Sequence, residues 1–298
     1  MKKNIIALAV AAAISAPVAM AGAPTVYGKL HMAIQSDAKS SDAGMTTDSV
    51  ASRFGIKGSE DLGNGLKAVY KIEYGINLDA AKNSPAARNQ YVGLKGGFGT
   101  VLMGTHDTPL KMIQTSDLFN DGISDNSKVI KSSSKGGEVR ASNVIAYVSP
   151  SFSGVKIIAA GVAGEGTDSG LADTTSVALA YGSKKKGLYL AAAMDSTSGA
   201  DDVTRLAAQY KANGLVVNAM THNQGGKDAI VLNAGYKMGK MMPKIKWADN
   251  SGDVDGTYTS VGLDYSLGKK TKAYIDLLSR DAAAGDFSST TVGLIHKF

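Results

Sequence analysis

The 298-residue sequence contains no cysteine, only six prolines and one tryptophan. The lack of cysteine excludes disulfide bonds, thiol catalysis and thiolate metal sites. After the first 21 residues there is also no apolar run near the roughly 20 residues that a transmembrane helix needs. The longest such run, residues 155–164, already contains Lys156. The composition therefore excludes a disulfide scaffold and a bundle of membrane-spanning helices.

Signals for catalysis and for nucleic-acid binding are absent as well. The four histidines are scattered, and neither an HExxH zinc motif nor a G-x-S-x-G nucleophile elbow occurs. The formal net charge of +6 is not arranged as a basic face interleaved with aromatic residues. We therefore expect no catalytic residues, no metal site, no cofactor and no nucleic-acid partner, so the chain is predicted not to be an enzyme.

The first 21 residues are typical of a secretory signal peptide. Lys2 and Lys3 precede an apolar run over residues 5–14, and Ala19-Met20-Ala21 has the small-x-small pattern of a cleavage site. The run is too short to span a membrane. We expect residues 1–21 to be removed on export, which leaves a single domain, residues 22–298, with a formal net charge of +4.

Residues 52–78 show the pattern that the rest of the chain repeats. In the second half, apolar and aromatic residues such as Tyr70, Ile72 and Tyr74 alternate with mainly polar ones such as Lys71 and Glu73. Because side chains on a strand point alternately to opposite faces, one face is apolar and the other polar. The intervening residues 60–65 contain the Gly and Asn that tight turns favour. This segment predicts a two-faced β-hairpin.

Similar strands follow one another to the end of the chain. They cover residues 26–35, 52–78 (two strands), 88–95, 100–104, 139–149, 155–162, 175–182, 188–194, 203–210, 215–221, 229–237, 243–248, 257–267, 271–280 and 289–298. Short turns alternate with longer polar loops at residues 36–51, 79–87, 106–138, 164–174, 195–202, 222–228, 249–256 and 281–288. Short turns at one end and long loops at the other are typical of an outer-membrane β-barrel, with the turns facing the periplasm.

Tyrosines mark one end of these strands. Five of them lie just before short turns: Tyr147, Tyr181, Tyr210, Tyr236 and Tyr265. An aromatic girdle at a membrane boundary has this placement.

About sixteen strands are predicted, an even number that suits a closed antiparallel barrel. Closure requires the first strand to pair with the last, because a membrane barrel has no free edge. A barrel of this size encloses water. The expected luminal charges are Arg53, Lys57, Lys67, Lys71 and Glu73, which a dry core would bury at several kcal/mol each.

Three segments and the last residue carry a family resemblance. The hairpin RFGIKGSEDLGNGLKAVYKIEYGIN, the pair RNQYVGLKGGFGTVLMGTHD, the segment RASNVIAYVSPSFSGVK and the terminal Phe298 resemble the general diffusion porins of Gram-negative bacteria. The resemblance implies a homotrimer of 16-stranded barrels in the outer membrane, in contact with lipid and lipopolysaccharide. It also implies that the barrel-assembly machinery recognises Phe298.

The same resemblance implies a constriction. The third external loop, residues 106–138, folds into the lumen of such porins, and its acidic pair falls on Asp117 and Asp121. An arginine ladder on the opposite wall falls on Arg53, Arg88 and Arg140. Opposed charges order water and pass small hydrophilic solutes by diffusion.

Selectivity and two alternative functions stay open at this stage. Lys57, Lys67 and Lys71 on the luminal register predict a weak preference for anions. A substrate-specific channel for a sugar or an anion would use the same barrel but would add an aromatic track or a saturable site. A plugged structural barrel or adhesin would show apolar inward residues or a plug, and neither is evident from the sequence.

Overall fold

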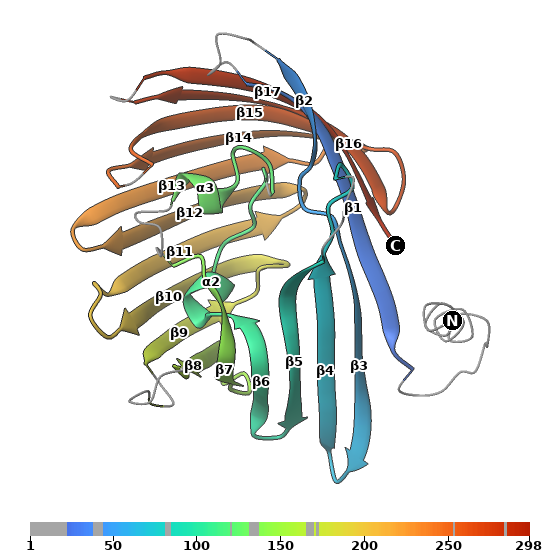
Figure 1. Ribbon diagram of the computed structural model, residues 1–298, viewed down its shortest axis with the longest axis vertical. Coiled ribbons are helices and arrows are strands. Elements are labelled where there is room, and N and C mark those ends of the chain that lie inside the picture. The colour runs from blue at the N-terminus through green and yellow to red at the C-terminus, as the bar shows by residue number, and fades with distance from the viewer. Residues whose placement is uncertain are drawn as a thin grey trace.

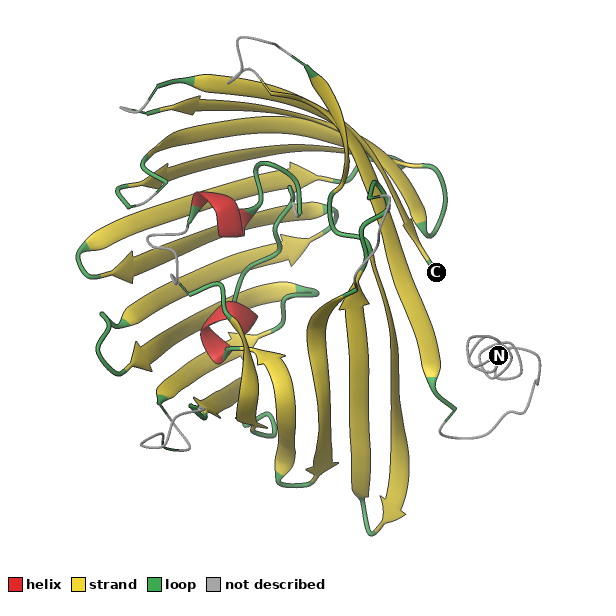
Figure 2. Cartoon of the chain, in the orientation of Figure 1, coloured by secondary structure: helices red, strands yellow, loops and turns green. Residues whose placement is uncertain are grey.

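The computed structural model describes residues 23–37, 44–80, 85–119, 121–130, 137–164, 170, 173–252, 254–282 and 285–298. The expected signal peptide lies outside these residues. Within them, no helix is both long and apolar enough to cross a membrane. The described chain consists almost entirely of antiparallel strands, with two short helices between β6 and β7 (Figures 1 and 2).

The elements follow the predicted order. The strands are β1 Thr25–Asp37, β2 Met45–Ser49, β3 Arg53–Gly63, β4 Leu66–Gly75, β5 Ala86–Gly96, β6 Gly99–Asp107, β7 Arg140–Val148, β8 Val155–Val162, β9 Thr174–Gly182, β10 Gly187–Thr197, β11 Val203–Ala212, β12 Leu215–Gln224, β13 Lys227–Tyr236, β14 Met241–Asn250, β15 Gly256–Ser266, β16 Thr271–Asp281 and β17 Phe287–Lys297. The helices are α2 Pro109–Met112 and α3 Asn126–Val129.

Hydrogen bonding closes the sheet into a barrel. β1 pairs with β17 along one edge, and its other edge pairs with β2 toward one end and with β3 toward the other. The two short strands therefore share one position, separated by a break at residues 50–52. The backbone bridges this break, because the Val50 N–H donates to the carbonyl of His31 at 3.0 Å. The result is a closed barrel of sixteen strand positions, as predicted.

Alternation along each strand sets an outward apolar face. On β10, Leu188 and Leu190 are 47% and 43% exposed, whereas Tyr189 and Ala191 between them are buried. Large exposed apolar side chains recur on most strands, as expected of a surface in contact with hydrocarbon. Four of the five predicted girdle tyrosines, Tyr181, Tyr210, Tyr236 and Tyr265, are among the exposed residues, and Tyr147 is half-buried.

Several turns are tighter than the sequence suggested. The β3–β4 turn consists of Asn64 and Gly65, both with positive φ, rather than residues 60–65. The loop expected at residues 222–228 is only Gly225 and Gly226, because β12 and β13 extend through the remaining residues. No long loop therefore extends from the outer end of the barrel between β12 and β13. The expectation of uniformly long loops at that end was wrong here.

The barrel interior contains an apolar core, which was not expected. Leu110, Ile113, Val129 and Ile130 between β6 and β7 are fully buried. They pack with inward residues of the wall to form a cluster that we call the inner core. Its wall residues include Ala191, Ala193, Val203, Ala207, Met220, Val231, Ala248, Tyr258 and Leu278. The prediction that inward apolar residues are absent was therefore wrong for this part of the wall.

Candidate functional site

The segment between β6 and β7, here called loop 3, lies within the ring of strands (Figures 1 and 2). It begins with α2, whose N-cap Thr108 accepts a hydrogen bond from the Lys111 N–H and whose first residue is Pro109. Both features are typical of a helix start. α2 contacts β9 and β10, and α3 contacts β13 and β14. Loop 3 is therefore seated on one part of the inner wall.

Polar contacts with the wall fix the middle of loop 3. The Thr115 hydroxyl donates to Asn218 at 3.0 Å, and the Ser116 N–H donates to Gln209 at 2.7 Å. The Asn250 amide donates to the carbonyl of Val129 at 3.0 Å. Together these bonds satisfy loop backbone and side-chain groups that lie away from water.

Asp117 belongs to this anchor. Its carboxylate is 2.9 Å from the ammonium of Lys246 on β14, and its side chain is only 3% exposed. It also accepts the N–H groups of Phe119 and Asn126, and so shapes the loop backbone. The structure thus pairs Asp117 with Lys246 on β14, and none of the described ion pairs joins it to Arg53, Arg88 or Arg140.

A second buried ion pair secures the end of loop 3. Arg205 on β11 is 1% exposed, and its guanidinium lies 2.7 Å from the carboxylate of Glu138. The same guanidinium is 3.2 Å from Nδ1 of His222 and donates to the carbonyl of Leu110 at 3.4 Å. Arg205 therefore joins the start and the end of loop 3 to the wall.

Asp121 is the loop acid that reaches the arginines. Its carboxylate accepts from Lys29 and lies 3.1 Å from the guanidinium of Arg53. Burial raises the pKa of Asp121, but the positive charges of Lys29 and Arg53 outweigh it and hold this pKa below its ordinary value. The backbone at Asp121 has φ of 67°, and its N–H donates to Asp125 at 2.6 Å. The loop acid thus contacts an arginine directly, rather than facing it across an open gap.

The other two arginines pair with carboxylates of the wall itself. Arg88 on β5 donates to Glu73 on β4 at 2.8 Å, and Lys71 lies 3.2 Å from the same carboxylate. The Tyr27 hydroxyl also donates to Glu73, at 2.7 Å. Glu73 was expected on the luminal face, but its pairing with Arg88 was not predicted.

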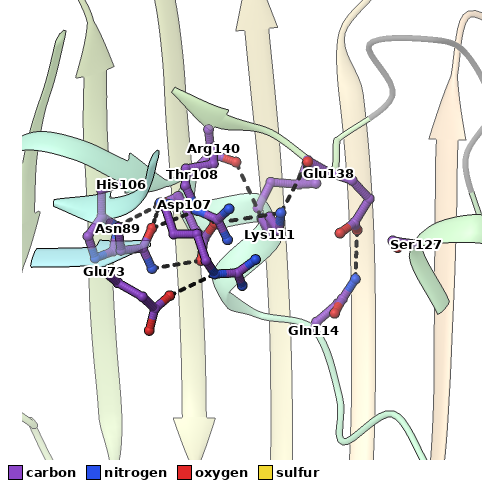
Figure 3. Close-up of polar contacts among 12 residues, drawn as sticks. Glu73, Asn89, His106, Asp107, Thr108, Lys111, Gln114, Ser127, Glu138 and Arg140 are labelled. Carbon is purple, nitrogen blue, oxygen red and sulfur yellow. Dashed lines mark hydrogen bonds and ion pairs between the residues drawn. The ribbon is translucent and has the colours of Figure 1, made fainter. Parts of the chain in front are cut away.

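Asp107, the last residue of β6, is the third carboxylate (Figure 3). Arg140 lies 3.0 Å from it and Lys111 lies 3.5 Å from it. Asn89 donates to Asp107 at 3.0 Å and accepts from Arg140 at 2.9 Å. Figure 3 shows these side chains turned toward one another, with Gln114 and Glu138 beside them.

The three groups follow one rule: each carboxylate is shared by one lysine and one arginine. We call them the three triads, and their members are Lys29, Arg53 and Asp121; Lys71, Arg88 and Glu73; and Lys111, Arg140 and Asp107. Six cations face three carboxylates, so the triads carry an excess of positive charge. Because most members have side chains 12–24% exposed, water reaches them.

Open space lies on both sides of Asp121. A cavity of about 610 Å³ on the short-turn side is lined by Tyr27, Arg53 and Glu73, among others. A second cavity, of about 520 Å³, is lined by Ser52, Arg88 and Lys128, among others. Asp121 lines both cavities. Asp121 of the first triad therefore lies at the boundary between these two cavities.

The remaining predicted residues lie at different depths. The ammonium of Lys57 is 5.2 Å from the centroid of the Tyr27 ring and that of Lys71 is 5.8 Å from it, which places both near the triads. Lys67 is 3.8 Å from Asp61 beside the β3–β4 turn, with half of its side chain exposed. Phe298 exchanges backbone hydrogen bonds with Gly28 at the β1–β17 seam, and its side chain is exposed.

Sequence reasoning missed several residues of the site: Lys29, Lys111, Glu138, Arg205 and Lys246. Arg205 and Lys246 had a detectable signal. Each is a basic residue on an inward register that also carries apolar residues, with Val203 and Ala207 flanking Arg205 and with Lys244 and Ala248 flanking Lys246. Lys29 and Glu138 had no local signal, because their partners are distant in sequence.

Comparison with known proteins agrees with this architecture. The profile described as Gram-negative porin matches residues 7–282. The chain is 28% identical to the major outer membrane protein P.IB of Neisseria gonorrhoeae and 29% identical to that of Neisseria lactamica, and each alignment covers all of both chains.

Solved structures show the same fold. The anion-selective porin from Comamonas acidovorans superposes with a TM-score of 0.78 at 21% identity, covering 93% of this chain and all of that one. OmpT of Vibrio cholerae, in a form described as a trimer, superposes with a TM-score of 0.70 at 15% identity, covering 94% of this chain and all of that one. The family points to a channel rather than an enzyme, and the chain belongs to the Gram-negative porin family of outer-membrane β-barrels.

Proposed function

We propose that this porin is a general diffusion channel with a weak preference for anions, set by the three triads. The observation that carries the proposal is the excess of cations over carboxylates around Asp121, Glu73 and Asp107. Charges that line an aqueous passage concentrate ions of opposite sign and repel ions of the same sign. Because each carboxylate is already neutralised by one cation, the second cation leaves a net attraction for anions.

The preference is weak for a physical reason. Each cation is held at a carboxylate, and water screens the pair, so little of the charge acts at long range. Small hydrophilic solutes meet polar groups throughout this side of the lumen. Apolar solutes would have to displace water that these charges bind. The structurally similar porin from Comamonas acidovorans is described as anion-selective, which is consistent with this preference.

The proposal includes the cellular context. Residues 1–21 act as a cleaved signal peptide, and the segment predicted as the third external loop, residues 106–138, acts as the constriction. Three copies associate in the outer membrane, where the exposed apolar bands contact lipid and lipopolysaccharide. The barrel-assembly machinery recognises the C-terminal strand through Phe298, whose exposed ring lies at the barrel seam. One structural neighbour is described as a trimer, which supports the oligomeric state.

The test is single-channel recording of the refolded protein in a planar bilayer under a KCl gradient. We expect ohmic steps that arrive in groups of three and a zero-current potential of the sign that chloride preference gives. A current that saturates with one sugar or anion would replace this proposal with a substrate-specific channel. A silent, correctly folded barrel would show that loop 3 and the inner core close the lumen.

A further inference from the structure

The cavity on the short-turn side of Asp121 has a composition that the diffusion function does not require. Its lining includes six cations: Lys29, Arg53, Lys269, Lys270, Lys272 and Lys297. Among the described residues, three acidic ones line it: Glu73, Asp117 and Asp121. Of these, Asp117 is paired with Lys246 and Glu73 with Lys71 and Arg88, and among the cations Lys272 is paired with Asp264. The cavity therefore has a surplus of positive charge at the end of the pore that faces the periplasm.

The arrangement of three of these cations is specific. In the β1–β17 pairing Lys29 lies directly opposite Lys297, and in the β1–β3 pairing it lies directly opposite Arg53. Directly opposed residues on neighbouring strands have Cβ atoms about 5 Å apart, and like charges in such positions destabilise a sheet. A row of three cations across β17, β1 and β3 thus costs stability, and among the described residues the acid outside the sheet that pairs with this row is Asp121, which contacts Lys29 and Arg53.

The turn between β15 and β16 adds further cations to this row. The N–H of Lys297 donates to the carbonyl of Lys270 at 2.8 Å, so the turn is fastened beside the end of β17. Figure 1 shows these segments together near the C-terminus. In the described part of the chain, the ammonium groups of Lys269, Lys270 and Lys297 form no hydrogen bond or ion pair. They are exposed to the cavity and available to a ligand.

We infer that this cavity is a binding site for small multivalent oxyanions that enter from the periplasmic end. Lys269, Lys270 and Lys297 provide the unpaired cations, and Lys29 and Arg53 close its inner end against Asp121. A volume of about 610 Å³ accommodates an anion with several charged oxygens, and several ammonium groups around one anion bind it more tightly than a single pair does. The inference rests on the proposed open channel. It predicts that the channel responds differently to a multivalent anion added on one side of the membrane or on the other.

The opposite cavity explains why the effect has a direction. It is lined by the cations Arg88 and Lys128 and by the acids Asp121 and Asp125, so its charges balance. Among the described residues that line this cavity, there is no group of free ammonium side chains comparable to Lys269, Lys270 and Lys297. A multivalent anion should therefore interrupt the current when it is added on the turn side, and do so less when added on the loop side.

The test uses inorganic pyrophosphate as the probe, with channels inserted in one orientation in a bilayer at low KCl and without divalent cations. We expect pyrophosphate on the turn side to interrupt the current at a concentration several-fold lower than on the loop side. The double substitution Lys269→Gln/Lys270→Gln should weaken the interruption from the turn side several-fold. The conductance measured at high KCl, where salt screens the charges of this turn, should stay nearly unchanged.

The matched control is Lys185→Gln/Lys186→Gln, which removes the same charge from the exposed β9–β10 turn at the same end of the barrel. It should leave the interruption unchanged.

Equal interruption from both sides, or equal sensitivity of the two double variants, would overturn the inference while the KCl conductance still supports the channel. A protein without KCl conductance would instead contradict the proposed function, and pyrophosphate binding would then be measured by calorimetry in detergent. Binding that is detectable in the parent protein and abolished in Lys269→Gln/Lys270→Gln would support the binding site. The absence of binding would contradict it.

Discussion

The two halves of the inner wall carry different kinds of side chain. On β1 to β7 the inward residues include seven of the nine triad members, all except Lys111 and Asp121 of loop 3, and they remain in contact with water. On β9 to β14 they include Ala191, Ala207, Met220 and Val231, which are buried under loop 3. One wall thus lines an aqueous passage, and the other is half of a hydrophobic core. Apolar packing on one side of the barrel fixes the position of loop 3. Charged residues on the other side determine which ions pass.

This division explains why two acids of the same loop differ in role. Asp117 is buried against Lys246, so its charge stabilises the position of loop 3. Asp121 contacts Lys29 and Arg53 between two cavities, so its charge acts on passing ions. Substitutions on the packed side should change the size of the pore, whereas substitutions on the charged side should change its selectivity.

The largest effect is expected from Lys246→Met on the packed side. The substitution leaves the buried carboxylate of Asp117 without its cation, which costs about 3–5 kcal/mol. Loop 3 should then leave the wall, and the single-channel conductance should become larger and noisier. The double variant Lys246→Met/Asp117→Leu removes both charges and should restore most of the parent behaviour. An unchanged conductance in the single variant would mean that the inner core alone holds the loop.

Next in size is Arg88→Glu on the charged side. It removes the arginine of one triad and places a second carboxylate beside Glu73. The ratio of chloride to potassium permeability should fall several-fold, while the conductance changes much less. The zero-current potential under a KCl gradient measures this ratio. Lys185→Glu makes the same charge change in an exposed turn, and an equal shift in that variant would show that the effect is not local.

A pH titration tests the role of Asp121 on the charged side. Because the folded-state pKa of Asp121 lies below its ordinary value of 3.8, its ion pairs stabilise the fold above that pH. This stabilisation is lost as the pH falls through the depressed pKa. Selectivity should therefore stay constant from pH 7 to about 4 and shift toward anions only below it. Asp121→Asn should already show the shifted selectivity at pH 7. A shift beginning near pH 5 in the parent would contradict the assignment.

The smallest effect is expected at Lys67. Its exposed ammonium lies 3.8 Å from Asp61 at the end of the barrel, so water screens its charge. Lys67→Gln should leave the zero-current potential unchanged within error. Lys71→Gln, further along β4 and next to Glu73, should shift it toward cations. Equal shifts would mean that selectivity depends on total charge and not on position.

The barrel itself was predictable because it rests on a local pattern. Alternation places Ile72 outside and Lys71 inside wherever the partner strand lies, and turn residues mark the ends. The path of loop 3 rests on contacts that no local pattern records. Asp117 and Asp121 look equivalent in sequence, and only the distant partners Lys246 and Arg53 distinguish them. The apolar half of the wall was missed because its inward residues are often alanines, which read as neutral beside the larger outward side chains.

The turn at Gly225 and Gly226 has a practical consequence. It joins β12 and β13 at the end of the barrel that faces the medium, and a side chain at Gly226 would meet open space. Strands below it belong to the packed half of the wall, away from the triads. A short peptide tag inserted after Gly226 would therefore stand on the cell surface without entering the ion path. This short turn is therefore a suitable insertion site for displaying a peptide on the cell surface. Antibody labelling of intact cells would detect the inserted tag.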